Sequence, residues 1–334
     1  MEYAVNMENR AADFTEVRLL GEDDAPAMRK LFREVFGESM SSQFWEWKYS
    51  INDGHAVGAF RGMHMIGHYG GVGTDIRYFG KPAKAMQIVD VMVRPAARQA
   101  VRKQSPFFLT GSRFLEKFVG NGKPYLLGYG FPSDRHMKLA SHLGLYAGVG
   151  QMTELSWQLQ GISVKPNLWH RVVELDSENF DRLKPKLALL WRQMSAELDS
   201  DIVVDKTPQW IKRRYLLNPE RKYRRYLMLS RFSGRPLGFI VLKDEGARML
   251  IMDIIAPQRH FPLLIQLAAS LAIGAGRHTL GTWCSEAFKK HFSAMGPQAT
   301  TLPVITPANI WTAGPAPELL RNHWWLMPGD TDFL

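Results

Sequence analysis

The segment Phe44–Asn52 has the sequence FWEWKYSIN, and a similar segment, WIKRRYLLN, occurs at Trp210–Asn218. This recurrence indicates a repeat within the chain. Their tyrosines, Tyr49 and Tyr215, lie about half of the 334-residue chain apart. Further pairs follow in the same order, namely Gly62 with Gly234, Gly67 with Gly238, and Asp90-Val91 with Asp253-Ile254. A repeat of this length is a whole domain, so the sequence predicts two tandem domains, of which one alone could carry the chemistry.

The length of the chain and its apolar content also fit two packed cores. A chain of 334 residues, 46% of them hydrophobic, ordinarily divides into two domains. We expect the first domain over residues 1–160 and the second over residues 168–334. Residues 161–167, where glycine and proline interrupt the hydrophobic pattern, are the expected linker.

Cysteine content and hydropathy bear on the compartment. The single cysteine, Cys284, cannot form an intramolecular disulfide or a cysteine metal site. Residues 1–10 lack the apolar core of a signal peptide. The uncharged run Phe261–Gly276 is shorter than the roughly 20 residues that cross a bilayer, so it predicts a buried helix. We therefore expect a cytoplasmic protein without a membrane span.

The net charge of +10 favours anionic partners such as a nucleotide cofactor, RNA or a membrane surface. Basic side chains cluster at residues 94–103 and 212–225. Such clusters can equally form a solvated face, so charge alone does not choose among these partners.

The hydrophobic pattern predicts alternating helices and strands in both halves. A capped helix is expected at residues 27–36, where Gly37 ends it. The other helices expected are 105–119, 134–143 and 262–275, and the strands are 56–61, 63–70, 85–93, 125–131, 151–157, 226–230, 237–242 and 249–255.

The segment after the strand at 85–93 reads Val93-Arg94-Pro95-Ala96-Ala97-Arg98, a V-x-P-x-x-R pattern. A basic loop follows, and then Ser105-Pro106, a serine N-cap with proline at the first helical position. In this order the chain resembles the GNAT superfamily of N-acetyltransferases, whose cofactor segment runs strand, V-x-P-x-x-R, glycine-rich turn and helix. Gly130-Phe131-Pro132-Ser133 and Leu143-Gly144-Leu145 extend the resemblance to one branch of that superfamily.

The resemblance implies an α/β (α+β) fold of two tandem acyl-CoA N-acyltransferase (GNAT-like) domains, each a mixed, mostly antiparallel sheet flanked by helices. It implies acetyl-CoA, or another acyl-CoA, as co-substrate and no metal. A strand that parts from its neighbour leaves backbone groups for the amide-bearing arm of coenzyme A, and a helix N-terminus receives the pyrophosphate. The residues implied to bind the cofactor are Val91, Met92, Val93, Arg98, Arg102, Lys103, Gln104, Ser105, Phe107 and Ser133.

The chain departs from the superfamily in the turn between strand and helix. The two small residues of the consensus, which let backbone approach phosphate, are replaced within Arg102–Phe107. Arg102 and Lys103 are left as charge donors. In the second copy, His260-Phe261-Pro262-Leu263 follows Arg259 without a basic loop, so we expect that copy to be degenerate and structural.

Two residues are candidates for proton transfer. Asp90 is the candidate general base, because we expect a carboxylate in an apolar strand to be buried at the site. A structural role for Asp90 is the alternative, favoured by its counterpart Asp253 in the degenerate copy. The tyrosine acid of the superfamily is replaced by Ala140, and Tyr146 is the preferred substitute, with His142 and Ser141 as weaker ones.

Several other motifs have two interpretations. His68 and Tyr69 could line the acceptor side or belong to the core. The aromatic residues Trp45, Trp47 and Tyr49 could stack on a ligand, but their recurrence in the second copy favours core packing. The segment Trp324–Asp332 resembles a W-x-x-x-x-G-D-x-D tail of the same GNAT branch.

The leading functional hypothesis is an N-acyltransferase that moves an acyl group, expected to be acetyl, from coenzyme A to an amine of a small molecule or sugar precursor. One alternative is a tRNA-dependent aminoacyl transferase of the peptidoglycan-bridge type, although the helical arm of those proteins is not evident. The other is a non-catalytic binding protein with the GNAT fold. We expect a coenzyme A thioester and a small amine as partners and do not expect nucleic acid.

Overall fold

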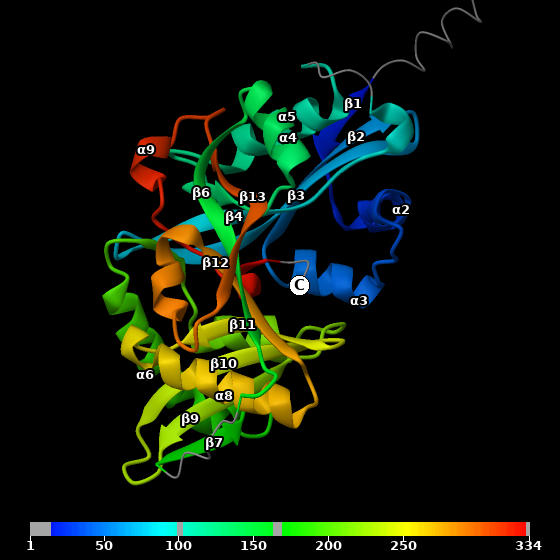
Figure 1. Cartoon of the computed structure of the whole chain (residues 1–334). Helices are drawn as coiled ribbons and strands as arrows, with labels where there is room; N and C mark the ends of the chain where they lie inside the picture. Colours follow the sequence, from blue (N-terminus) through cyan, green and yellow to red (C-terminus); the bar gives the residue numbers. More distant parts are fainter. Residues whose placement is uncertain (1–14, 99–102, 163–168, 332–334) are drawn as a thin grey trace, which may run out of the picture. The chain divides into compact units, whose positions relative to one another are not determined.

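The computed structural model describes residues 15–98, 103–162 and 169–331 (Figure 1). Residues 1–10, Arg102, residues 163–167 of the expected linker and Asp332 lie outside the described residues. Two compact units make up the chain. The first unit comprises residues 1–74, 84–149 and 305–319, and the second comprises residues 75–83, 150–304 and 320–334.

The first unit is built on a sheet with the strand order β1-β2-β3-β4-β5. β1 and β2 pair antiparallel, as do β2 and β3, whereas β4 and β5 pair parallel. The strands are β1 Glu16–Leu19, β2 Gly54–Arg61, β3 His64–Tyr78, β4 Lys81–Val93 and β5 Leu127–Tyr129. The helices are α2 Ala25–Phe36, α3 Ser42–Trp45, α4 Pro106–Phe118 and α5 Asp134–His142, with a π-helical turn η2 at Glu46–Ser50 and 3-10 turns η1 Glu22–Asp24 and η3 Pro95–Ala97.

The second unit repeats this plan in a sheet with the order β13-β6-β12-β11-β10-β9-β7. The strands of this sheet are β6 Tyr146–Gln158, β7 His170–Glu174, β9 Arg224–Ser230, β10 Pro236–Glu245, β11 Arg248–Ile255, β12 Thr279–Ser285 and β13 Gln298–Asn309. The short strands β8 Ile202–Val204 and β14 Trp324–Trp325 pair parallel with each other, and β8 pairs antiparallel with the end of β3 at Ile76–Tyr78. The helices are α6 Phe180–Glu197, α7 Pro208–Ile211, α8 Phe261–Gly274 and α9 Pro317–Leu320, with a π-helical turn η4 at Lys212–Leu216 and 3-10 turns η5 Gln258–His260, η6 Glu286–Phe292 and η7 Pro328–Asp330. The mixed, mostly antiparallel sheets flanked by helices confirm the predicted fold class.

The repeat extends to the start of the aromatic segment in each copy. Ser41 caps α3 by accepting a hydrogen bond from the amide of Phe44, and Thr207 caps α7 by accepting one from Trp210. A π-helical turn follows in both copies. Backbone bonds of the i to i+5 kind close these turns, from Ile51 N to Glu46 O and from Leu217 N to Lys212 O, each 3.0 Å long.

Local signals in the sequence explain most element boundaries. Gly37, with φ 79°, ends α2 as predicted, because a left-handed residue cannot continue a helix. Ser105 and Pro106 begin α4, whose buried side includes Phe107, Phe114 and Phe118. These side chains of α4 pack against β2 and form the main hydrophobic core of the first unit.

Several predicted strands differ in extent from the observed ones. The strand expected at 63–70 continues to Tyr78, and the one expected at 85–93 begins at Lys81. The strand expected at 125–131 is confined to Leu127–Tyr129, because only three residues of β5 pair with β4. The strand expected at 151–157 begins earlier, at Tyr146, where apolar side chains of the first core continue into β6. The run predicted as a buried helix is α8, and none of the described helices is long and apolar enough to cross a membrane.

Candidate functional site

A bulge in β4 places Asp90 at the centre of the first unit. Before Asp90, Met86 and Ile88 pack on the buried cluster around Phe107 and Phe114, here called the α4 core. Val89 packs on the cluster around Met28 and Leu31, the α2 core. After Asp90, Val91 and Val93 pack on the α4 core. This change of parity means that one residue interrupts the alternation of the strand. Asp90 is that residue, with φ 48°, in the left-handed region that aspartate tolerates better than most residues.

The carboxylate of Asp90 is held by two side chains from the π-helical turn η2. Lys48 Nζ donates to Oδ1 at 2.8 Å, and the hydroxyl of Tyr49 donates to Oδ2 at 2.6 Å. Both charges are buried, with side-chain exposures of 3% for Lys48 and 5% for Asp90. The wider π turn lets two consecutive residues reach one carboxylate, and π turns are frequent at functional sites.

His68 of β3 contacts the backbone of the same residue. Its Nδ1 lies 2.6 Å from the carbonyl oxygen of Asp90. A carbonyl can only accept, so Nδ1 carries the proton and Nε2 carries the lone pair. Burial lowers the pKa of His68, so the ring is neutral near pH 7. Nε2 is buried and has no hydrogen-bond partner among the residues that the structure describes.

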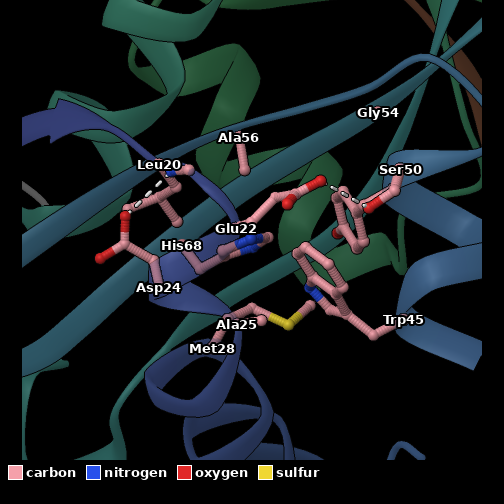
Figure 2. A pocket seen from close by; sticks show the side chains of 12 residues that line it. Leu20, Glu22, Asp24, Ala25, Met28, Trp45, Ser50, Gly54, Ala56 and His68 are labelled. Carbon is pink, nitrogen blue, oxygen red and sulfur yellow. Dashed lines mark hydrogen bonds between the residues drawn. The ribbon is translucent and has the colours of Figure 1, made fainter. Parts of the chain in front are cut away.

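A pocket with a volume of about 240 Å³ opens beside these groups in the first unit. Figure 2 shows the ring of His68, the indole of Trp45 and the carboxylate of Glu22 around it. The lining residues are Leu20, Gly21, Glu22, Asp24, Ala25, Met28, Trp45, Tyr49, Ser50, Gly54, Ala56 and His68. The pocket therefore reaches Asp90 through two of its contacts, Tyr49 and His68.

The expected cofactor segment runs along β4 beyond its pairing with β5. The parallel ladder covers only Ala85–Gln87, while β4 continues to Val93. Val91 and Val93 are half-buried, and Met92 is buried in the α2 core. The strands thus part next to Asp90, leaving backbone of β4 without β5 as a partner.

The remaining predicted cofactor residues surround the start of α4 and α5. Ser105 and Ser133 are the N-caps of these helices, accepting from the amides of Phe108 and His136. Arg98 is exposed and donates from Nε to the carbonyl of Val93. Lys103 and Gln104 are exposed, and Nζ of Lys103 lies 6.0 Å from the ring centroid of Trp311. Phe107 is buried in the α4 core.

Tyr146 lies at the first position of β6, buried in the α4 core. Its hydroxyl is hydrogen-bonded to that of Tyr69. Burial raises the pKa of Tyr146, so the phenol keeps its proton across the neutral range. The residue is chemically able to donate a proton, and its role as acid stays a prediction.

The second unit carries the same tyrosine–aspartate pair in a closed environment. The hydroxyl of Tyr215 donates to Oδ2 of Asp253 at 3.0 Å, and Lys206 Nζ donates to Oδ1 at 2.7 Å. Lys206 also contacts Asp330 at 3.2 Å, and all three charged side chains are fully buried. The lysine here comes from a position before the helix cap, whereas Lys48 comes from the π turn itself.

The tail segment fills the second unit at this point. Turn η7 contacts both β11 and β12, the strands that correspond to β4 and β5. Arg214, the counterpart of Lys48, donates to the carbonyls of Gly329 and Thr331 at 2.9 and 2.6 Å. A Cβ on Gly329 would lie 2.0 Å from the hydroxyl of Tyr215, so only glycine fits there. The tail motif therefore packs against β11 and β12 and against the tyrosine–aspartate pair of the second unit.

Titration of Asp253 should be visible in the stability of the protein. Burial raises the pKa of Asp253 to about 6. A carboxyl whose pKa is higher in the folded state contributes stability at low pH that is lost as the pH rises through the folded pKa. The melting temperature of the wild type, relative to that of Asp253→Asn, should therefore rise as the pH falls from about 7 to about 5. A difference that does not change with pH would contradict this assignment.

The sequence pattern did not identify Lys48 or Glu22 as site residues, and it favoured core packing for Tyr49. One signal was present: Lys48 interrupts an aromatic run, and a buried lysine needs a carboxylate partner. Among the described residues, no group of three or more His, Cys, Asp or Glu side chains is placed to hold a metal.

Comparison with protein families identifies residues 16–103 as an acetyltransferase (GNAT) domain. No curated protein sequence matches the chain. The matched range includes Lys48, Tyr49, His68 and Asp90, and it ends at Lys103 in the basic loop.

Solved structures share the fold over most of the chain. A probable N-acyltransferase from Enterococcus faecalis V583 has a TM-score of 0.70 at 11% identity, over 89% of this chain and 73% of its own. A GCN5-related N-acetyltransferase from Anabaena variabilis has a TM-score of 0.66 at 12% identity, over 90% and 73%. N-myristoyltransferase from Saccharomyces cerevisiae, solved with bound myristoyl-CoA, has a TM-score of 0.56 at 10% identity, over 91% and 84%. At these identities the likeness establishes the fold alone.

Proposed function

We propose that this chain is an N-acyltransferase of the GNAT superfamily, whose acetyltransferase domain residues 16–103 match. It moves an acyl group from a coenzyme A thioester to an amine of a small molecule. The first unit carries the reaction, and the second unit is structural.

The parting of β4 from β5 is the observation that supports this function most strongly. Beyond Gln87 the backbone of β4 is available to the amide-bearing arm of coenzyme A, as the adjacent strand no longer pairs with it. The N-terminus of α4 follows, where the helix dipole favours a pyrophosphate. Lys103 adds a positive charge at the same helix start.

In the second unit the strands β11 and β12 also diverge, but the tail segment lies beside them. β11 pairs with β12 only over Arg248–Leu250, as β4 does with β5. The tail then contacts both strands through η7, and Gly329 approaches the tyrosine–aspartate pair closely. We therefore assign acyl-CoA binding to the first unit alone.

The chemistry asks little of the protein beyond positioning and proton transfer. The amine nitrogen attacks the thioester carbon, the new C–N bond forms, and the C–S bond breaks to release coenzyme A. Asp90 and its contacts lie where the cofactor strand opens, so they are placed to receive the amine's proton directly or through His68. Tyr146, which keeps its proton, is the proposed donor to the departing thiolate.

Acyl-CoA binding should appear as a thermal shift. Ligand that binds only the native state stabilises it by about 2.7 kcal/mol at a hundred times Kd, so acetyl-CoA should raise Tm by several degrees. Arg102→Glu combined with Lys103→Glu should abolish most of this shift, because two cations of the basic loop become anions. Arg259→Glu, at the corresponding turn of the second unit, is the matched control and should keep it.

The same titration can disprove the assignment. A shift that survives the double variant and disappears in Arg259→Glu would move the site to the second unit. Absence of any shift with acetyl-CoA and longer acyl-CoA thioesters would refute the proposed function. Tightly bound RNA in the purified protein, seen as excess absorbance at 260 nm, would favour the aminoacyl transferase instead.

A further inference from the structure

We propose that the pocket beside Asp90 is the acceptor site, that it takes a small primary amine carrying a second positive charge, and that Nε2 of His68 receives the proton of the reacting nitrogen. This inference rests on the proposed acyl transfer and names its substrate class and its base.

The pocket adjoins the point where the cofactor strand opens. Tyr49 and His68 are lining residues, and both are hydrogen-bonded to Asp90, three residues beyond the end of the β4–β5 ladder. An acyl group carried by coenzyme A along β4 would therefore end beside this pocket. A volume of about 240 Å³ has room for a small molecule.

The charges around the pocket select a cation. None of the 12 lining residues is lysine or arginine, although the whole chain has a net charge of +10. Asp24 is neutralised by Arg18, whose guanidinium donates to it at 2.6 and 2.8 Å. Glu22 has no such counter-charge among the described residues; Ser50 donates a hydrogen bond to it at 3.4 Å. Glu22 thus gives the pocket a negative charge.

An aromatic wall adds to this preference. Trp45 lines the pocket and stacks on Tyr49 with ring centroids 5.6 Å apart. An indole face attracts an organic cation by about 0.5–2 kcal/mol, depending on desolvation. Together with the Glu22 carboxylate, it forms a site for an ammonium or guanidinium group that does not itself react.

His68 supplies a buried ring nitrogen to the lining of the pocket. The residue is 1% exposed, yet its Nε2 has no partner among the described residues. A buried polar atom without a partner is costly, and it is explained when a ligand completes the hydrogen bond. The Asp90 carbonyl fixes the proton on Nδ1, so the lone pair on Nε2 is the group available to the pocket.

The balance of protons is simple. An ammonium substrate loses two protons overall: R–NH₃⁺ and the acyl thioester become R–NH–acyl, the coenzyme A thiol and one proton. His68 Nε2 accepts a proton from nitrogen and passes it to solvent. The other proton ends on the thiol sulfur as the C–S bond breaks.

The substrate class can be tested with a matched pair of acceptors. With acetyl-CoA, 1,4-diaminobutane should react with a kcat/KM at least about tenfold above that of 4-amino-1-butanol, which lacks the second charge. Glu22→Gln should remove this preference by raising KM for the diamine with kcat little changed. Glu22 is exposed, so the substitution should not disturb folding. Equal rates for the two acceptors would overturn the substrate class.

The base can be tested on the same strand. His68→Gln should lower kcat by about a hundredfold or more while the acetyl-CoA thermal shift persists, which shows that the variant is folded. His64→Gln, at the exposed start of β3, is the matched control and should keep full activity. A His68→Gln variant within threefold of the wild type would exclude His68 as the base.

The pH profile separates the base from a merely structural histidine. The charged groups facing His68 are Asp90 and Lys48, with Glu22 and Asp24 across the pocket. Because burial lowers the pKa of His68, kcat should begin to fall only at pH values below the usual histidine range. This fall in kcat at low pH should be absent in His68→Gln. A fall in kcat that survives in His68→Gln would overturn the assignment.

Two outcomes separate this inference from the proposed function. If the protein binds acyl-CoA and turns over only other amines, this inference alone is refuted. If it neither binds acyl-CoA nor turns over any amine, the proposed function is refuted as well.

Discussion

Replacement of Lys206 by methionine should lower the free energy of unfolding of the second unit by about 3–5 kcal/mol. Lys206 is fully buried and contacts both Asp253 and Asp330. Without it, two buried carboxylates would face each other with no cation between them. For a unit of this size the loss corresponds to a fall in Tm of roughly 6–20 °C, measurable by calorimetry.

Lys222→Met is the control, because Lys222 is exposed and belongs to the same unit. It should change Tm by no more than a degree or two. If Lys206→Met is as stable as this control, the buried cluster of Lys206, Asp253 and Asp330 contributes little to the free energy of unfolding, and other contacts hold the tail in place. Arg214 and its bonds to Gly329 and Thr331 would then be the next candidates.

Replacement of Asp90 by asparagine should be nearly as damaging to the first unit, by about 3 kcal/mol or more. Asparagine tolerates the positive φ and keeps the backbone carbonyl that orients His68. What changes is the charge, because buried Lys48 loses the carboxylate that neutralises it. Calorimetry should show a lower Tm, and Asp253→Asn provides the comparison in the second unit.

The double variant Lys48→Met with Asp90→Asn then distinguishes a structural aspartate from a catalytic one. Removing both charges should recover most of the lost stability, since replacing a whole buried pair is often neutral. If Asp90 acts by orienting His68 through its carbonyl, kcat should stay within about tenfold of the wild type. A stable double variant that has lost about a hundredfold or more would instead identify the carboxylate as the base.

Local signals predicted the fold because each of them acts within a few residues. Ser105-Pro106 begins a helix and Gly37 ends one through hydrogen bonds and backbone angles set by their immediate neighbours. The tandem arrangement was predicted from the repeated order of such signals. Gly62 and Gly234, for example, both adopt positive φ in the turns between paired strands.

The site was predicted less well because its contacts are distant in sequence. Asp90 was identified as a polar residue in an apolar strand, but its partners Lys48 and His68 lie on other elements, and no periodicity joins them. The bulge that turns Asp90 toward them depends on pairing across the sheet. The tail could not be assigned either, since Asp330 meets Lys206 only in the folded chain.

The π-helical turns give evidence of how the two copies arose. A π turn contains one residue more than an α-helical turn, and both copies have it at the same distance after the helix cap. The simplest history is that the extra residue entered the ancestral domain once, before duplication. The lysines, by contrast, come from different positions, Lys48 inside the turn and Lys206 ahead of the cap. The tyrosine–aspartate pair and the basic residue before the tyrosine, Lys48 or Arg214, then belong to the shared plan, whereas the lysine at the aspartate of the second copy, Lys206, comes from a position of its own.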